Sequence, residues 1–290
     1  MLKCIICGGE MPEQFNLTQH EECADDEHFT TLYSTKMPYL NFPESPCDEM
    51  ISFDTGEHVW YKREDKNAIS QSFKDRKSAF IKNISPISQK FALASCGNQA
   101  LSLAKTFRNL ADNTYLYLPS DISYEKLKDL RSLYKDISFV DRILSTSELA
   151  QNESNRWNLS NGQDPIGGSA VYTLGFELEN FDFDTIFVPM GSGELYSYLS
   201  VYLKILRKKN VNVVPVKCHH PLAEAIRTDF IPMQPFIDYF GVNPVVVSNI
   251  ESISNSAEQI GCSFSSAVVF EAYKQLKPEG RTCLVVTGAK

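Results

Sequence analysis

Residues 91–98 read Phe-Ala-Leu-Ala-Ser-Cys-Gly-Asn, an apolar run that ends in a turn of small residues. The apolar residues that follow recur at helical spacing, at Ala100, Leu103, Ala104, Phe107 and Leu110. A buried strand that leads through a short turn into an amphipathic helix is the repeating unit of a parallel α/β protein. This stretch therefore predicts the strand–turn–helix order on which the rest of the fold is built.

Further apolar runs follow along the chain. They are Tyr115–Leu118, Ile137–Val140, Ile186–Val188, Val213–Val216, Val245–Val247 and Leu284–Val286. Their hydrophobicity is continuous rather than alternating, which is typical of strands that are covered on both faces. Helical stripes at Leu195–Leu206 and Val269–Leu276 lie between the later runs. We therefore predict a three-layer α/β/α fold with mostly parallel sheets.

The organisation into domains follows from where this alternation starts and stops. The first 60 residues lack periodicity, and the polar stretch Gln151–Gly168 is interpreted as a loop between lobes. We expect an N-terminal appendage over residues 1–50 and a small domain over residues 88–165. The large domain would comprise residues 51–87 and 166–290.

Composition excludes several classes of partner. The chain has 290 residues, a formal net charge of -8 and no block of Lys or Arg, which argues against nucleic acid. No stretch approaches the roughly 20 apolar residues of a membrane span, so we expect no membrane partner. The first residues carry no apolar run typical of a secretory signal, and the eight cysteines are scattered. We expect a cytoplasmic protein with free thiols.

Lys74 lies in the run Ser72-Phe73-Lys74-Asp75-Arg76. A lysine that condenses with an aldehyde must be partly desolvated and held at a defined point. The alternative interpretation is the solvated start of a charged helix, and these five residues alone do not decide between the two.

Three turns of small residues follow predicted strands. Ser95-Cys96-Gly97-Asn98 exposes backbone N–H groups at a helix start, where a carboxylate is stabilised. Gly191-Ser192-Gly193-Glu194 lets the backbone approach a phosphate closely. Thr287-Gly288 ends the last strand with a hydroxyl that suits a pyridine nitrogen. An ordinary strand–helix turn, a tight turn and a strand-end cap are the respective alternatives.

The order and spacing of these motifs resemble the fold type II enzymes that use pyridoxal phosphate (PLP). Within that group the likeness is strongest to threonine synthase and runs from about residue 50 to the end. The residues that carry it are Lys62, Glu64 and Asn67, then Ser72–Arg76, Asp164-Pro165, Gly168–Thr173, Ala225–Arg227 and Thr287-Gly288. The resemblance implies a two-lobed fold, PLP as cofactor and a small amino-acid substrate.

The resemblance also implies a role for each motif. Lys74 would hold the cofactor covalently and act as the base that moves the α-proton. Ser95, Cys96, Gly97 and Asn98 would receive the substrate carboxylate, with Asn98 also beside the cofactor. Gly191, Ser192, Gly193 and Glu194 would form the phosphate loop, and Thr287 would face the pyridine nitrogen. Many fold type II enzymes are dimers, so we expect a homodimer.

Three features depart from the threonine synthase pattern. Glu194 replaces a residue that is usually small, and a carboxylate beside a phosphate costs energy unless it is paired or points away. The region between Lys217 and Arg227, which helps to shape the substrate side, is compressed. The small-residue threonine–proline signal of the family is absent around Thr55–Val59.

A metal site is the hypothesis for the N-terminal segment. Cys4, Cys7, His20 and Cys23 form a C-x2-C-x12-H-x2-C arrangement that could close a tetrahedral zinc site. Isolated thiols are the alternative, and the acidic run Glu21–Glu27 and His20 in place of a cysteine weaken the zinc pattern.

The function that this sequence favours is a PLP-dependent lyase or synthase. It would act by elimination or replacement at the β or γ carbon of an amino acid, as threonine synthase does on O-phosphohomoserine. A serine/threonine dehydratase or a β-replacing synthase is the alternative among enzymes. A noncatalytic binding or regulatory relative is the alternative of another class.

Overall fold

A computed structural model of the chain describes residues 1–20, 22–23, 29–38, 42–51, 57–141, 155–228 and 230–290. The described part contains a six-stranded, a four-stranded and a three-stranded sheet. Among the described residues, no helix has the length and the apolar character that crossing a membrane requires.

The six-stranded sheet has the order β12-β11-β10-β13-β5-β4. Its strands are β4 (Cys47–Ile51), β5 (His58–Arg63), β10 (Thr185–Pro189), β11 (Asn212–Lys217), β12 (Val245–Val246) and β13 (Thr282–Val286). β4 pairs antiparallel with β5, and the other neighbours are parallel. The carboxyl ends of β5, β10 and β13 therefore lie at one edge, which is where open α/β sheets bind ligands.

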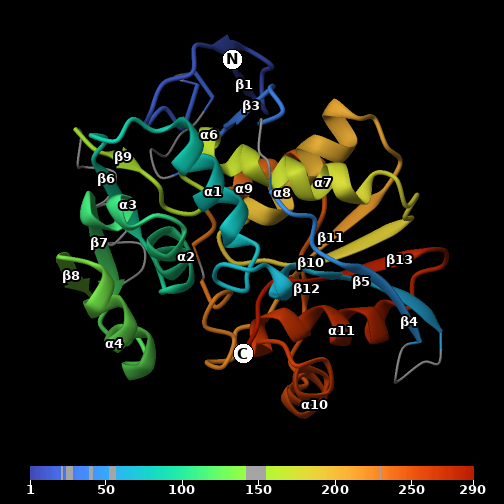
Figure 1. The fold of residues 1–290 in the computed structure, drawn as a ribbon. Coiled ribbons are helices and arrows are strands. Elements are labelled where there is room, and N and C mark those ends of the chain that lie inside the picture. The colour runs from blue at the N-terminus through green and yellow to red at the C-terminus, as the bar shows by residue number, and fades with distance from the viewer. Residues whose placement is uncertain (21, 24–28, 39–41, 52–56, 142–154, 229) are drawn as a thin grey trace.

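Helices cover both faces of this sheet (Figure 1). Ile186 and Val188 of β10 pack with α7 (Tyr172–Leu178), α8 (Glu194–Ser200) and α9 (Gln234–Phe240). Phe187 points to the opposite face, with α10 (Ile250–Ile260) and α11 (Phe264–Leu276). α8 continues as a π-helix, η3 (Val201–Leu206). Both faces bury apolar side chains, which is why the strand sequences are continuously apolar.

The four-stranded sheet has the order β8-β7-β6-β9, with all pairs parallel. Its strands are β6 (Phe91–Ala94), β7 (Thr114–Pro119), β8 (Asp136–Val140) and β9 (Trp157–Asn158). α2 (Asn98–Thr106), α3 (Arg108–Asp112) and α4 (Tyr124–Leu133) pack on it, and α1 (Lys74–Ile84) packs against α2. The fold-class prediction is confirmed: both larger sheets are mostly parallel and belong to an α/β fold.

Two sequence-based expectations need correction within these elements. The helix expected over Ala100–Leu110 is divided between α2 and α3, because Phe107 is extended with φ -162° and ψ 116°. The expected loop Gln151–Gly168 contains β9 and the short helix α6 (Pro165–Gly168), while residues 151–154 lie outside the described part. Trp157 is buried and pairs with Phe91, so tertiary contacts order a stretch of polar composition.

The three-stranded sheet is antiparallel and lies at the N-terminus, with the order β2-β1-β3. β1 (Leu2–Cys4), β2 (Glu10–Met11) and β3 (Leu32–Ser34) are too short to show periodicity in sequence. The hydroxyl of Tyr172 donates to the carbonyl of Ser34 at 2.7 Å, so this sheet is attached to α7. Two 3₁₀ helices, η1 (Glu64–Lys66) and η2 (Ser169–Val171), complete the described elements.

Candidate active site

The segment that carries Lys74 is hydrogen-bonded to the end of the last strand. The N–H of Phe73 donates to the carbonyl of Thr287 at 3.0 Å, and Ser72 forms a bridge with Gly288. The N–H of Ala289 in turn donates to the carbonyl of Gln71 at 3.0 Å. The structure thus brings the lysine motif and the Thr-Gly motif together at one edge of the large sheet.

The Lys74 side chain is half-buried at the first position of α1. Its Nζ lies 4.2 Å from the centroid of the Phe73 ring, and among the described residues it forms no ion pair with a carboxylate. Burial lowers the pKa of Lys74 to about 8, although the nearby charge of Glu194 opposes this shift. At neutral pH about one such amine in ten is uncharged and nucleophilic.

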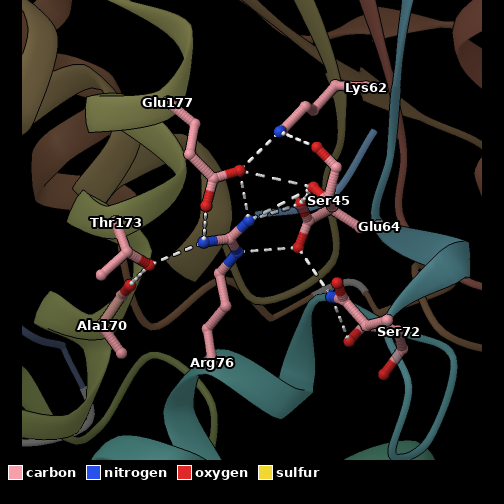
Figure 2. A network of polar contacts seen from close by, with 9 residues as sticks. Ser45, Lys62, Glu64, Ser72, Arg76, Ala170, Thr173 and Glu177 are labelled. Carbon is pink, nitrogen blue, oxygen red and sulfur yellow. Dashed lines mark hydrogen bonds and ion pairs between the residues drawn. The ribbon is translucent and has the colours of Figure 1, made fainter. Parts of the chain in front are cut away.

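A buried network around Arg76 fixes the turn that precedes α1 (Figure 2). Arg76 donates from Nε and Nη2 to Glu64 at 2.8 and 2.7 Å. It donates from Nη1 and Nη2 to Glu177 at 2.7 and 2.9 Å. Nη1 also donates to the hydroxyl of Thr173 at 2.8 Å. The planar guanidinium therefore joins α1 to η1 and α7 in a single geometry.

The charges in this network balance. Lys62 Nζ lies 2.5 Å from Glu177, so two cations face two carboxylates. Burial alone would raise the pKa of Glu64, but the Arg76 charge and its hydrogen bonds outweigh burial and lower the pKa to about 2. Asn67 donates to Glu64 at 2.9 Å and to the carbonyl of Ser72 at 3.0 Å. These residues position Lys74 without touching its amine.

The Ser95–Asn98 turn follows β6 and starts α2. Gly97, with φ +114°, is the N-cap, and its N–H donates to the Ser95 hydroxyl at 3.0 Å. Asn98 is therefore the first residue of the helix and not its cap, and its half-buried side chain bonds to none of the described residues. The N–H groups of Cys96 and Asn98 have no acceptor in the described part of the chain. They are available to an anion.

Cys96 belongs to the Ser95–Asn98 turn and is half-buried. Burial raises the pKa of the Cys96 thiol to about 11, so this thiol is neutral at physiological pH.

The Gly191–Gly193 loop follows β10 and leads into α8. A Cβ on Gly191 would lie 2.7 Å from the carbonyl oxygen of Ala225, and Gly193 has a left-handed φ of +89°. Among the described residues, the N–H groups of Gly191, Ser192 and Gly193 find no acceptor. Unpaired N–H groups at a helix start make this loop suitable for a phosphate.

Glu194 is buried but compensated. Its carboxylate lies 3.0 Å from Lys77 Nζ and accepts the N–H of Gly162 at 2.7 Å. Burial would raise the pKa of Glu194, but the charges of Lys77 and Lys74 lower it below the ordinary value. The cost expected for a carboxylate in this loop is therefore offset by Lys77 on α1.

The Thr287 hydroxyl lies 3.0 Å from the hydroxyl of Ser266 on α11. Ser266 also meets the carbonyl and the N–H of Gly288, at 3.0 and 2.9 Å. The hydroxyl of Thr287, directly after β13, is therefore a neutral group held in place by the hydroxyl of Ser266.

These residues fit PLP. A desolvated amine, unpaired backbone donors and a fixed hydroxyl correspond to its aldehyde, phosphate and ring nitrogen. When bound, PLP supplies an electron sink next to the α-carbon of an amino acid.

Two residues of this region were not predicted from sequence. Lys77 and Asp164 are buried with their charged groups 3.5 Å apart. The available signal for Lys77 was its position three residues after Lys74, on the same side of a helix. Asp164 was part of the family resemblance, but nothing in the sequence indicated its contacts with Lys77 and Trp157.

The sequence profile described as "Pyridoxal-phosphate dependent enzyme" matches residues 45–288, so the chain belongs to this family of PLP-dependent enzymes. No curated protein matches the sequence significantly. The expectation of a fold type II PLP-dependent enzyme is thereby confirmed, and solved structures agree with it.

Three solved structures illustrate the shared fold. The L-serine ammonia-lyase of Rhizomucor miehei is 15% identical, with a TM-score of 0.68 over 86% of this chain and 94% of that chain. Threonine deaminase isoform 2 of Solanum lycopersicum is 19% identical, with a TM-score of 0.69 over 86% and 80%. The O-acetylserine dependent cystathionine beta-synthase of Helicobacter pylori is 19% identical, with a TM-score of 0.70 over 86% and 93%.

Proposed function

We propose that this protein is a PLP-dependent lyase that eliminates or replaces a group at the β or γ carbon of an amino acid. The observation that carries the proposal is the position of Lys74. Its amine has a lowered pKa and no carboxylate partner among the described residues, and its segment is bonded to the strand end that bears Thr287. Because a hydroxyl does not hold a pyridine nitrogen protonated as a carboxylate would, elimination and replacement are favoured.

The chain's own groups would divide the work as follows. Lys74 would hold the cofactor, and its amine would act as the base that takes the α-proton of the substrate. The unpaired N–H groups of Cys96 and Asn98 hold the substrate carboxylate, with the side chain of Asn98 beside the cofactor. The Gly191–Gly193 loop holds the cofactor phosphate, and Lys77 keeps the adjacent Glu194 neutralised.

The preferred substrate is O-phosphohomoserine or a related activated hydroxy-amino acid, as in threonine synthase. Lys126 and Arg227 are the cations that we propose would meet its phosphate. Lys126 packs against Gly97, and Arg227 follows Ala225, which touches Gly191. Their side chains pair with Glu224 and Asp121. The phosphate would have to displace these carboxylates.

A dehydratase acting on serine or threonine is the second candidate. The pairing of both cations favours it, because a substrate with a neutral hydroxyl needs no free cation. The names of two similar structures, an L-serine ammonia-lyase and a threonine deaminase, agree with this candidate.

The experiment supplies the purified protein with PLP and compares two reactions. Phosphate release from O-phosphohomoserine supports the first candidate, and release of ammonia and a keto acid from serine or threonine supports the second. Lys74→Ala is the control and should abolish turnover while the protein stays folded. Turnover that is unchanged in this variant would exclude the mechanism. Absence of every product in the native protein would favour a noncatalytic binding or regulatory role.

We also propose a cytoplasmic homodimer. None of the eight cysteines, all of which lie in the described part of the chain, forms a disulfide, which agrees with a reducing compartment. Sedimentation of the purified protein tests the oligomeric state, and cell fractionation tests the compartment.

A further inference from the structure

The four N-terminal residues Cys4, Cys7, His20 and Cys23 come together in the structure. The sulfur atoms of the three cysteines lie within 4.8 Å of one another. Nδ1 of His20 lies 3.7 Å from the Cys23 sulfur and 3.9 Å from the Cys7 sulfur. In a tetrahedron with metal–sulfur bonds of about 2.3 Å, the ligand atoms are about 3.8 Å apart. The distances from His20 to the Cys7 and Cys23 sulfurs match this spacing, and the three sulfurs lie within 4.8 Å of one another.

The turn between β1 and β2 is shaped to hold the first two sulfurs. Gly8, with φ +73°, allows the chain to reverse, and the N–H of Cys4 donates to the carbonyl of Gly9 at 2.9 Å. The N–H of Gly9 donates to the sulfur of Cys7 at 3.4 Å. A backbone donor of this kind stabilises a thiolate, which is the form of cysteine that binds metal.

His20 is brought to the same place by two separate features. A Cβ on Gly9 would lie 2.9 Å from Nε2 of His20, so a glycine is needed for the ring to approach. The N–H of His20 donates to the Thr31 hydroxyl at 3.1 Å, and the N–H of Cys23 donates to the carbonyl of His20 at 2.9 Å. His20 and Cys23 are therefore held at the two ends of one turn, with both side chains directed to the same point.

We propose that Cys4, Cys7, His20 and Cys23 form a structural zinc site. Three thiolates and one imidazole in a tetrahedral arrangement suit zinc rather than magnesium or calcium, which take oxygen ligands. Four protein ligands leave no open position, so the ion would stabilise the fold and take no part in the reaction. Binding would release the protons of the three thiols.

The site would brace the loop that we assign to the cofactor phosphate. Thr30, next to the Thr31 that holds His20, donates from its N–H to the carbonyl of Pro232 at 2.8 Å and from its hydroxyl to the carbonyl of Gly162 at 2.5 Å. The N–H of Gly162 donates to Glu194, and the N–H of Met233 donates to the carbonyl of Ser192 at 3.3 Å. This bracing role, unlike the zinc site itself, rests on the proposed function.

The first experiment measures metal content by mass spectrometry after purification without an affinity tag. We expect about one zinc per chain. Replacement by cobalt(II) should produce the strong visible bands of a tetrahedral thiolate complex. Cys7→Ser and His20→Ala should weaken zinc binding by more than the ~10–100-fold that loss of an outer partner costs. Cys47→Ser and His58→Ala are matched controls outside the cluster and should retain the metal.

The result that would overturn the zinc site is specific. Protein without zinc that also gives no cobalt bands, or a Cys7→Ser variant that retains the metal fully, contradicts it. The bracing role is tested separately, by PLP binding before and after chelation. Loss of zinc with unchanged PLP affinity removes the bracing role alone, whereas zinc-loaded protein that binds no PLP contradicts the proposed function alone.

Discussion

Nζ of Lys77 lies 3.0 Å from the carboxylate of Glu194, which joins helix α1 directly to the first residue of α8. Lys77 is one turn beyond Lys74, so the same helix carries the amine that we propose binds PLP and the cation that neutralises the Glu194 carboxylate. The carboxylate of Asp164 lies 3.5 Å from the same Nζ of Lys77. The three charges form a buried cluster whose balance affects Lys74.

Replacing Glu194 with Gln removes a negative charge near Lys74. The pKa of Lys74 should fall below about 8, because Glu194 now opposes the effect of burial. The free energy of unfolding should fall by about 2–4 kcal/mol, since Lys77 keeps only Asp164. The pH dependence of Lys74 acetylation in cofactor-free protein, mapped by mass spectrometry, measures the first effect. Glu271→Gln, a change at a buried position on α11, is the control and should leave the pH dependence of Lys74 acetylation unchanged. If Glu194→Gln also leaves it unchanged, Glu194 does not affect the pKa of Lys74.

Arg76→Lys should destabilise the protein strongly. A lysine cannot bond to Glu64 and Glu177 in the same paired geometry, so two buried carboxylates lose partners. We expect a loss of about 3–5 kcal/mol in urea unfolding. Arg207→Lys is the control, because Arg207 pairs with Glu179 at a half-exposed position and its change should cost less than about 1 kcal/mol. Equal losses in both variants would show that the Arg76 network is not special.

Gly193→Ala tests the phosphate loop. A Cβ there would lie 2.8 Å from Cβ of Met233 at a left-handed φ, so the loop must shift. Gly261 has a similar φ of +73° with nothing near its Cβ, and Gly261→Ala should cost only about 1 kcal/mol. We expect PLP affinity, followed by absorbance titration, to fall at least about tenfold in Gly193→Ala alone. Equal affinities in the two variants would argue against a phosphate at this loop.

Lys74 should also make the stability of the cofactor-free protein depend on pH. Its pKa is about 8 in the folded protein and 10.5 in the unfolded reference, so the unfolded state binds more protons between these values. The free energy of unfolding should therefore rise with pH across this window. Below it, the amine is protonated in both states, so Lys74 does not make stability depend on pH. Allowing for solvent that reaches the amine, the rise is about 1–2 kcal/mol. The free energy of unfolding in urea is measured at several pH values for the cofactor-free wild-type protein and for Lys74→Met. The two plots of this free energy against pH should differ in slope only between the two pKa values. Parallel plots would contradict the lowered pKa of Lys74.

The strands β6–β8 and β10–β13 could be predicted because each is a run of mainly apolar residues. The strands β4, β5 and β9 could not, because their short, partly polar sequences show no such run. Ile186 and Val188 pack against one layer of helices and Phe187 packs against the other. Because both faces of the strand are buried, these three residues are all apolar. The turns after β6, β10 and β13 could be located because each places small residues at a strand end.

The N-terminal sheet and the partners of Glu194 could not be predicted. β1 and β3 have three residues each, too few for a periodic pattern, and their pairing joins distant segments. Lys77 and Gly162, which compensate Glu194, come from different parts of the chain. Such contacts depend on the tertiary fold rather than on local spacing.

The most direct test of the central claim is the location of the covalent adduct. The purified protein is incubated with PLP and reduced with borohydride, and its intact mass and peptides are then measured. We predict one reduced adduct per chain, on the peptide that contains Lys74. An adduct on a different lysine, or unmodified protein after excess PLP, would contradict the assignment of Lys74 as the lysine that binds PLP.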